Sequence, residues 1–157
     1  MGKIILICGK IGAGKTAYAH KLAKTLPAIE FNYEELQKQL STNDIGDHEK
    51  VIQALKFFLL SMAIQASKRV NVILDWGFWS ADERRKTTAL LKKNHCEYEW
   101  HYLYAPDAFC AENIRRHSGA EGAESDNALL EDELVMKLNG IFEEPKPEEM
   151  DIWTSCL

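Results

Sequence analysis

Residues 9–16 read GKIGAGKT and fill every fixed position of the pattern G-x-x-x-x-G-K-[ST]. In a loop of this kind, backbone N–H groups surround phosphate oxygens, the lysine reaches the terminal phosphates, and the hydroxyl can bind Mg²⁺. Thr16 is therefore also a predicted metal ligand. The residues predicted to contact phosphate are Gly9, Gly12, Ala13, Gly14, Lys15 and Thr16.

The segments on either side of this loop support the same interpretation. The short apolar run Lys3–Cys8 precedes it and is typical of a strand buried on both faces of a parallel sheet. A helix is predicted after Lys15, and Pro27 ends that run. A helix N-terminus favours an anion, because its N–H groups are free and its dipole is positive there. One face of this helix carries apolar residues at helical spacing, namely Ala19, Leu22, Ala23 and Leu26.

Asp75 is the second candidate site residue, at the end of the apolar run Val70–Asp75. If this run is a strand next to Lys3–Cys8, its carboxylate lies close to the phosphate loop and can hold Mg²⁺ through water. The alternative is an acidic residue that only ends a strand. We predict a catalytic and metal-binding role for Asp75.

Two further groups are candidates for catalysis. Glu34 and Glu35 follow a short strand candidate, where a carboxylate can accept the proton of an attacking hydroxyl. They can equally be solvated glutamates in a first helical turn. Arg115 and Arg116 precede a small, polar segment, 117–127, that we expect to form a mobile lid. Arginines beside a lid can stabilise the charge of a transferring phosphate, or they can be an exposed basic helix end.

Other notable side chains have two interpretations each. The aromatic residues after Asp75 can line an acceptor pocket or belong to the core; they are Trp76, Phe78 and Trp79. The next helix is basic, and most of its cations are expected to form a solvated face; they are Arg84, Arg85, Lys86, Lys92 and Lys93. The five histidines show no ligand spacing, so no metal is assigned to them.

The order of the predicted elements alternates strand and helix along the chain. This order predicts an α/β fold, a three-layer sandwich in which a parallel sheet of about five strands has helices on both faces. The predicted strands are Lys3–Cys8, Ala28–Phe31, Val70–Asp75, Tyr98–Leu103 and Ile152–Leu157. The predicted helices after the first are Tyr33–Leu40, Glu49–Lys68, Ser80–Lys93, Ala108–Arg116 and Ala128–Phe142. Ser80 and Glu83 have the spacing of a capping box at the start of the third of these helices.

Length and composition indicate one globular domain over residues 1–157, with 46% hydrophobic and 27% charged residues. The net charge of −5 argues against a dedicated binder of long nucleic acids, although a local basic groove is compatible with it. The four cysteines form no C-x-x-C pair, so we expect reduced thiols and a cytoplasmic protein. The most apolar stretch, Phe57–Ile64, is too short to span a bilayer and is expected to be the buried part of a long helix.

Four segments of the chain resemble a known family: KIILICGKIGAGKT, FNYEEL, VILDWGFWSADERR and HYLYAPD. They are similar to the small AAA-type ATP-binding proteins described as P-loop kinases, which are related to the chloramphenicol phosphotransferase and zeta-toxin group. The likeness extends from residue 3 to about residue 116. It implies a nucleotide-kinase-like P-loop NTPase fold, ATP bound by residues 12–16, and a Mg²⁺ or catalytic role for Asp75.

The same resemblance bears on two other positions. Glu34 stands where the family usually has an aspartate that resembles the acceptor-activating carboxylate. The family commonly carries two arginines near the lid, and here Arg116 matches the second, while Glu112 and Asn113 stand at the place of the first.

Together these features predict a kinase that uses ATP and Mg²⁺ and transfers the γ-phosphate to a hydroxyl of a small-molecule or nucleotide-like acceptor. Lys15, Glu34, Asp75 and Arg116 are its predicted catalytic residues. The alternative is a nucleotide-binding regulator or slow ATPase that has no phosphoacceptor. A nucleic-acid end kinase is a third possibility, which the acidic balance disfavours. The absence of an N-K-x-D motif argues against a GTPase. Neither the acceptor nor the oligomeric state is specified by the sequence.

Overall fold

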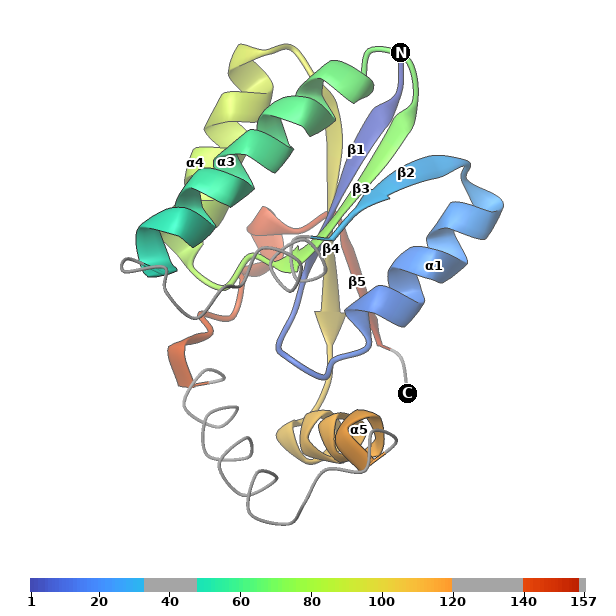
Figure 1. Ribbon diagram of the computed structural model, residues 1–157, viewed down its shortest axis with the longest axis vertical. Helices are drawn as coiled ribbons and strands as arrows, with labels where there is room; N and C mark the ends of the chain where they lie inside the picture. The colour runs from blue at the N-terminus through green and yellow to red at the C-terminus, as the bar shows by residue number, and fades with distance from the viewer. Residues whose placement is uncertain (33–47, 120–139, 156–157) are drawn as a thin grey trace.

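The computed structural model describes residues 1–32, 48–119 and 140–155 and contains a five-stranded sheet (Figure 1). All strand pairs are parallel, and the strand order is β2-β3-β1-β4-β5. The strands are β1 (Lys3–Cys8), β2 (Ala28–Phe31), β3 (Asn71–Gly77), β4 (Glu97–Tyr104) and β5 (Ile152–Ser155). The helices are α1 (Lys15–Thr25), α3 (His48–Ala66), α4 (Ala81–Lys93), α5 (Asp107–Gly119) and the short 3₁₀ helix η1 (Pro147–Glu149). This architecture confirms the predicted parallel α/β fold.

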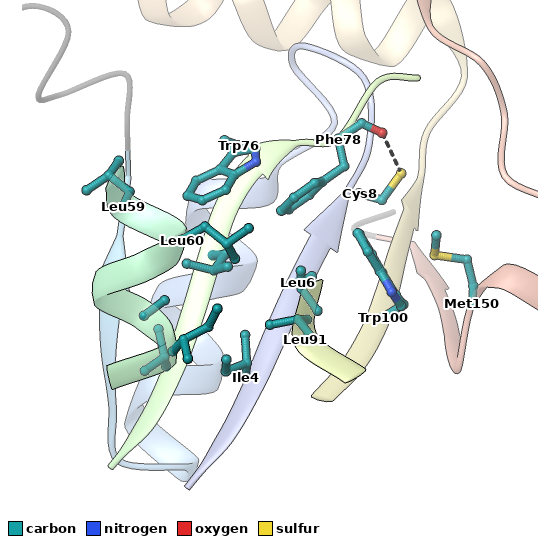
Figure 2. Close-up of a cluster of buried hydrophobic side chains, with 14 of the residues drawn as sticks. Ile4, Leu6, Cys8, Leu59, Leu60, Trp76, Phe78, Leu91, Trp100 and Met150 are labelled. Carbon is teal, nitrogen blue, oxygen red and sulfur yellow. Dashed lines mark hydrogen bonds between the residues drawn. The ribbon is translucent and has the colours of Figure 1, made fainter. Parts of the chain in front are cut away.

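The sheet is buried on both faces because successive side chains of a strand point in opposite directions. Helices α3 and α4 lie over one face, and α1 lies over the other (Figure 1). In β1, Ile4 and Leu6 belong to the core on the α3 and α4 side, while Ile5 and Ile7 pack with Ala19 of α1 on the opposite side. Figure 2 shows the larger core, in which strand residues meet Leu60 and Leu91 from the two helices, among others. The near-continuous apolar pattern of β1 follows directly from this double burial.

The predicted apolar face of α1 is confirmed. Ala19 is buried, and Leu22, Ala23 and Leu26 pack against the same cluster. The second strand and the last strand, both weak in sequence, also form where predicted. Helix α4 begins after Ser80, whose hydroxyl accepts a hydrogen bond from the Glu83 N–H at 3.0 Å. The Glu83 carboxylate binds Lys56 of α3 at 3.1 Å, which ties the two helices together.

The expectation for Phe57–Ile64 is wrong in part. Leu59, Leu60, Ala63 and Ile64 are buried, but Phe57 is 64% exposed and Phe58 is 58% exposed. A helix that lies on a sheet presents only one stripe to it, so residues beyond that stripe face away however apolar they are. No helix among the described residues is both long and apolar enough to span a membrane.

The end of α5 also differs from its expectation. The helix extends to Gly119, so residues 117–119 continue it rather than open the predicted lid. The remainder of that lid, 120–127, lies outside the described residues, as do the predicted helix Tyr33–Leu40 and residues 128–139.

Candidate phosphate-binding site

The phosphate loop connects the carboxyl end of β1 to the first turn of α1, as the sequence predicts. Gly14 is the N-cap residue of α1 with a φ of 91°, and Gly12 has a φ of 80°. These left-handed conformations are open to glycine at little cost, which explains the residue type at both positions. Gly14 provides no side-chain cap to the helix. The backbone N–H groups of the first turn point toward the loop at the positive end of the helix dipole, an arrangement suited to bind an anion.

Two lysines of the loop make polar contacts, one within the loop and one with helix α5. The Lys15 ammonium donates to the Lys10 carbonyl at 2.7 Å, which folds this side chain back along the loop. The Lys10 ammonium lies 2.7 Å from the carboxylate of Asp107, at the start of α5. The Asp107 side chain is 79% exposed, so this ion pair contributes little stability.

Thr16 and Asp75 meet at the loop because β1 and β3 are neighbours. Ile7 of β1 is in register with Asp75, and the Thr16 hydroxyl donates to Asp75 Oδ2 at 3.0 Å. Asp75 is only 5% exposed. The two strands are thus neighbours, and Asp75 lies beside the phosphate loop as the sequence predicts for that case. A hydroxyl and a carboxylate are hard oxygen ligands, the donor type that Mg²⁺ prefers.

Helix α5 forms a wall of the loop that the sequence did not predict. The Asn113 amide donates to the Gly12 carbonyl at 3.0 Å. A Cβ atom at Gly12 would lie 2.5 Å from the Cys110 carbonyl and 2.9 Å from Ile114 Cγ1. Gly12 therefore allows α5 to approach the loop backbone directly. The only sequence sign of this contact is that Asn113 occupies a position near the lid where the family carries arginine.

The remaining predicted catalytic residues are placed as follows. Glu34 lies outside the described residues. Arg116 is described and exposed, and its guanidinium lies 3.5 Å from the Glu112 carboxylate one turn earlier on the same helix. The described structure thus brings Thr16, Asp75 and Asn113 to the loop but shows Arg116 in a contact within α5.

The aromatic residues after Asp75 divide between core and surface. Trp76 is 4% exposed and Phe78 is fully buried, with their ring centroids 5.0 Å apart. Phe78 also packs edge-on against Trp100 at 4.8 Å. For these two residues the core interpretation is correct. Trp79 is partly exposed, and its carbonyl accepts a hydrogen bond from the Glu143 N–H at 2.8 Å.

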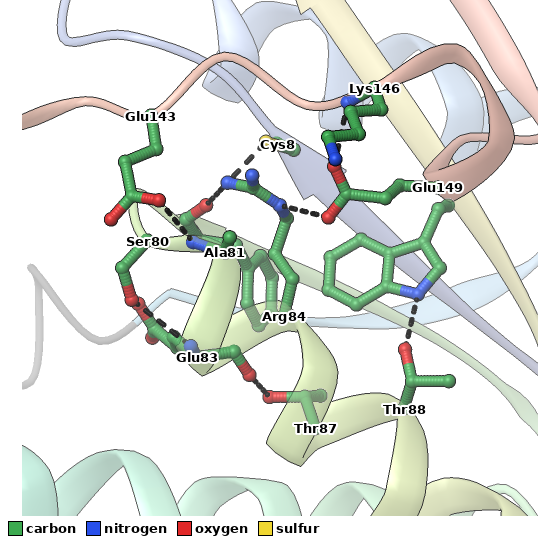
Figure 3. A network of polar contacts seen from close by, with 12 residues as sticks. Cys8, Ser80, Ala81, Glu83, Arg84, Thr87, Thr88, Glu143, Lys146 and Glu149 are labelled. Atoms are coloured by element: carbon green, nitrogen blue, oxygen red, sulfur yellow. Dashed lines mark hydrogen bonds and ion pairs between the residues drawn. The ribbon is translucent and has the colours of Figure 1, made fainter.

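A second polar cluster lies at the start of α4 and was not recognised in the sequence (Figure 3). Arg84 is 2% exposed, and it donates to the Phe78 carbonyl at 2.8 Å and to the Glu149 carboxylate at 3.2 Å. The Cys8 thiol also donates to the Phe78 carbonyl, at 3.6 Å. Burial raises the pKa of the Cys8 thiol to about 12, although Arg84 opposes that shift, so this thiol is neutral and unreactive at physiological pH. Arg84 is therefore an exception to the solvated basic face expected of its helix.

Solved structures with the same fold include several proteins of distant sequence. Kti12 of Chaetomium thermophilum, solved with ADP-AlF3, has a TM-score of 0.70 at 17% identity; the match covers 98% of this chain and 89% of that one. The APS kinase CysC of Mycobacterium tuberculosis, solved with AMPPNP and APS, has a TM-score of 0.67 at 16% identity, covering 99% and 88%. A gluconokinase from Sinorhizobium meliloti 1021 has a TM-score of 0.64 at 15% identity, covering 97% and 81%. At these identities the likeness establishes the fold.

No curated protein matches the chain significantly in sequence. The family comparison covers most of the chain, including β1, the phosphate loop and Asp75. Residues 4–145 match the family described as AAA domain, and the chain belongs to that family.

Proposed function

We propose that this protein is an ATP-dependent kinase that phosphorylates a hydroxyl of a small-molecule or nucleotide-like acceptor. The observation that carries the proposal is the joining of the phosphate loop to Asp75 through Thr16, at 3.0 Å. This arrangement provides backbone donors for an anion and two oxygen ligands at the carboxyl ends of neighbouring parallel strands, where ligands of such folds bind. A gluconokinase and an APS kinase with this fold provide support by analogy.

The residues of the loop fit ATP and Mg²⁺. The backbone N–H groups of residues 12–16 would hold the phosphates, and Thr16 with Asp75 would hold the metal. When bound, Mg²⁺ would neutralise negative charge on the phosphate oxygens. The Lys15 ammonium would leave its 2.7 Å contact with the Lys10 carbonyl to reach a terminal phosphate oxygen. Catalysis would then be mainly positioning and charge stabilisation.

In the proposed transfer, one bond to phosphorus forms as another breaks. The acceptor oxygen bonds to the γ-phosphorus, the bond from that phosphorus to the bridging oxygen breaks, and ADP leaves. We assign the hydroxyl proton to the carboxylate of Glu34 and transition-state charge stabilisation to Arg116, both from the resemblance to the family.

The test is Lys15→Ala measured against wild type, with ATP, Mg²⁺ and a panel of nucleosides, sugars, antibiotics and 5′-hydroxyl oligonucleotides. We expect the wild type to produce ADP rapidly with one acceptor class and the variant to lose more than about 100-fold of that rate. Lys21→Ala, an exposed lysine on the same helix, is the matched control and should keep the wild-type rate.

Two results would contradict the proposal. Transfer by Lys15→Ala at the wild-type rate would remove the loop from the chemistry. Slow ADP production that no acceptor accelerates would favour the regulator or ATPase alternative.

A further inference from the structure

A chain of polar side chains joins helix α1 to strand β4 on the face of the sheet that α1 covers. The Tyr18 hydroxyl lies 2.8 Å from His101 Nδ1, and His101 Nε2 lies 2.7 Å from Glu99 Oε1. The Lys3 ammonium donates to the other carboxylate oxygen of Glu99 at 3.0 Å. His101 is only 3% exposed, so both of its ring nitrogens are engaged inside the protein. The junction of α1 with β4 is therefore polar and buried.

The directions of these hydrogen bonds follow from the charge of Glu99. Burial alone would raise the pKa of the Glu99 carboxyl, but the contacts with His101 and Lys3 lower it below the ordinary value. The carboxylate is therefore ionised near neutral pH and can only accept, so His101 Nε2 carries a proton and donates to it. In the neutral imidazole, Nδ1 is then an acceptor, and the Tyr18 hydroxyl donates to it. Glu99 thus fixes the imidazole, and the imidazole fixes Tyr18.

Tyr18 connects this chain of contacts to the phosphate loop. It lies two positions after Thr16 and three after Lys15. Its N–H donates to the Gly14 carbonyl at 3.0 Å, within the first turn of α1. Its ring also packs against a buried cluster that includes Ala13 of the loop. A displacement of Tyr18 would therefore move the turn that carries the lysine and the threonine of the loop.

The apolar contacts of α1 fix its position less closely. Ala19 and Leu22 belong to a cluster with Ile5, Ile7 and Ile73 of strands β1 and β3. Apolar attraction is non-directional, so small rotations of the helix on this surface cost little burial. A hydrogen bond requires an aligned donor and acceptor, and a fully paired buried network specifies one arrangement. The contact with β4 is thus suited to set the orientation of the helix.

We propose that Tyr18 and His101 are positioning residues for ATP binding. The hydrogen bond between them fixes the first turn of α1 against β4 and so holds Lys15 and Thr16 in the arrangement that ATP and Mg²⁺ require. His101 acts through Tyr18 and is assigned no contact with the nucleotide. The inference rests on the proposed function, because it assumes that the loop binds ATP.

The first test is Tyr18→Phe, which removes the hydroxyl and keeps the ring. Calorimetric titration with ATP and Mg²⁺, without acceptor, measures the affinity. We expect it to fall about fivefold, the size of one lost hydrogen bond, because apparent affinity scales with the fraction of molecules whose loop is correctly arranged. Tyr98→Phe makes the same change in β4 on the opposite face of the sheet, and should change the affinity less than about twofold.

Two substitutions of His101 separate positioning from stability. His101→Asn can place its amide oxygen near the position of Nδ1 and accept from Tyr18. His101→Gln can place its amide nitrogen near the position of Nε2 and donate to Glu99, but it removes the acceptor that faces Tyr18. Both replace a buried ring with a smaller side chain, so both should lower the midpoint of urea denaturation by similar amounts. We expect His101→Asn to bind ATP within about twofold of wild type and His101→Gln to lose about fivefold.

The double variant Tyr18→Phe/His101→Gln should lose no more affinity than either single variant, because both changes remove the same hydrogen bond. Three results would overturn the inference: wild-type affinity in Tyr18→Phe, equal affinities in the two His101 variants, or additive losses in the double variant. None of these measurements needs an acceptor. A protein that binds ATP but transfers phosphate to no acceptor would contradict the kinase proposal alone, whereas a wild type that binds no ATP would contradict both.

Discussion

The phosphate loop and the Arg84 cluster are two polar regions that the fold builds in opposite ways. The loop consists of consecutive residues, 9–16, and presents backbone groups at a helix terminus. The Arg84 cluster uses a long side chain whose partner Glu149 is 65 positions away in sequence. The Arg84 side chain is 3% exposed and is bound by its own chain. The comparison teaches that a phosphate loop gathers the backbone donors of neighbouring residues at a helix terminus, whereas a stabilising network joins side chains from distant parts of the chain.

The strongest test of this contrast is Arg84→Ala. The change removes the guanidinium from the Phe78 carbonyl and the Glu149 carboxylate, which keep only the Cys8 thiol and the Lys146 N–H as donors, so we expect a loss of about 3 kcal/mol in the free energy of unfolding. Urea denaturation measures it. Arg85→Ala, an exposed neighbour, should change the value by less than about 0.5 kcal/mol. If Arg84→Ala weakened ATP binding while leaving stability unchanged, the contrast between the two regions would be wrong.

Gly12→Ala tests the loop side of the comparison. The new side chain would require a left-handed φ and would lie 2.5 Å from the Cys110 carbonyl, so the loop must change shape. We expect ATP affinity to fall more than about tenfold, with a stability loss of about 1–2 kcal/mol from the backbone conformation. Calorimetric titration measures the affinity. Gly140→Ala is the control, because no atom lies within 4 Å of its added Cβ. Unchanged ATP affinity in Gly12→Ala would mean that the loop shape is not required.

Asn113→Ala has a smaller expected effect. It removes one hydrogen bond to the Gly12 carbonyl, worth about 1 kcal/mol, so ATP affinity should fall roughly fivefold with little change in the fold. Asn113→Asp keeps the shape but replaces the donor with an acceptor, and should bind ATP no better than Asn113→Ala. Glu112→Ala, on the exposed side of α5, should retain wild-type affinity in the same titration. Wild-type affinity in both Asn113 variants would separate α5 from the function of the loop.

Glu149→Gln has the smallest expected effect on the free energy of unfolding, and this effect depends on pH. The contacts of Glu149 lower the pKa of its carboxyl below the ordinary value of 4.5, so its ion pair stabilises the fold fully above that pH. This contribution is lost as the pH falls through the depressed pKa. We therefore expect wild type to exceed Glu149→Gln by about 1 kcal/mol at pH 7, and the gap to narrow between pH 5 and 3. A gap that stayed constant with pH would contradict the assigned ion pair. Glu148→Gln, an exposed neighbour, is the control and should follow the wild-type profile.

The predictable parts of the fold are those whose signals are local. The double burial of β1 is visible as an apolar run, and the cap of α4 as Ser80 followed three residues later by Glu83. The exposed Phe57 and Phe58 were not predictable, because composition does not reveal which stripe of a helix meets the sheet. The Asn113 contact with Gly12 joins residues 101 positions apart, and a distance of that kind leaves no periodic signal.

The sequence by itself determined the order of the elements and the chemistry of the phosphate loop, because strand periodicity, helix spacing and the glycine pattern are properties of neighbouring residues. Only the tertiary structure decided what surrounds that loop. The pairing of β1 with β3 brings Asp75 to Thr16, and the position of α5 brings Asn113 to Gly12. Arg84 was expected on the solvated face of its helix, and the packing of the chain buries it instead. Strand order and helix packing arise from burial summed over the whole chain, so no short segment encodes them.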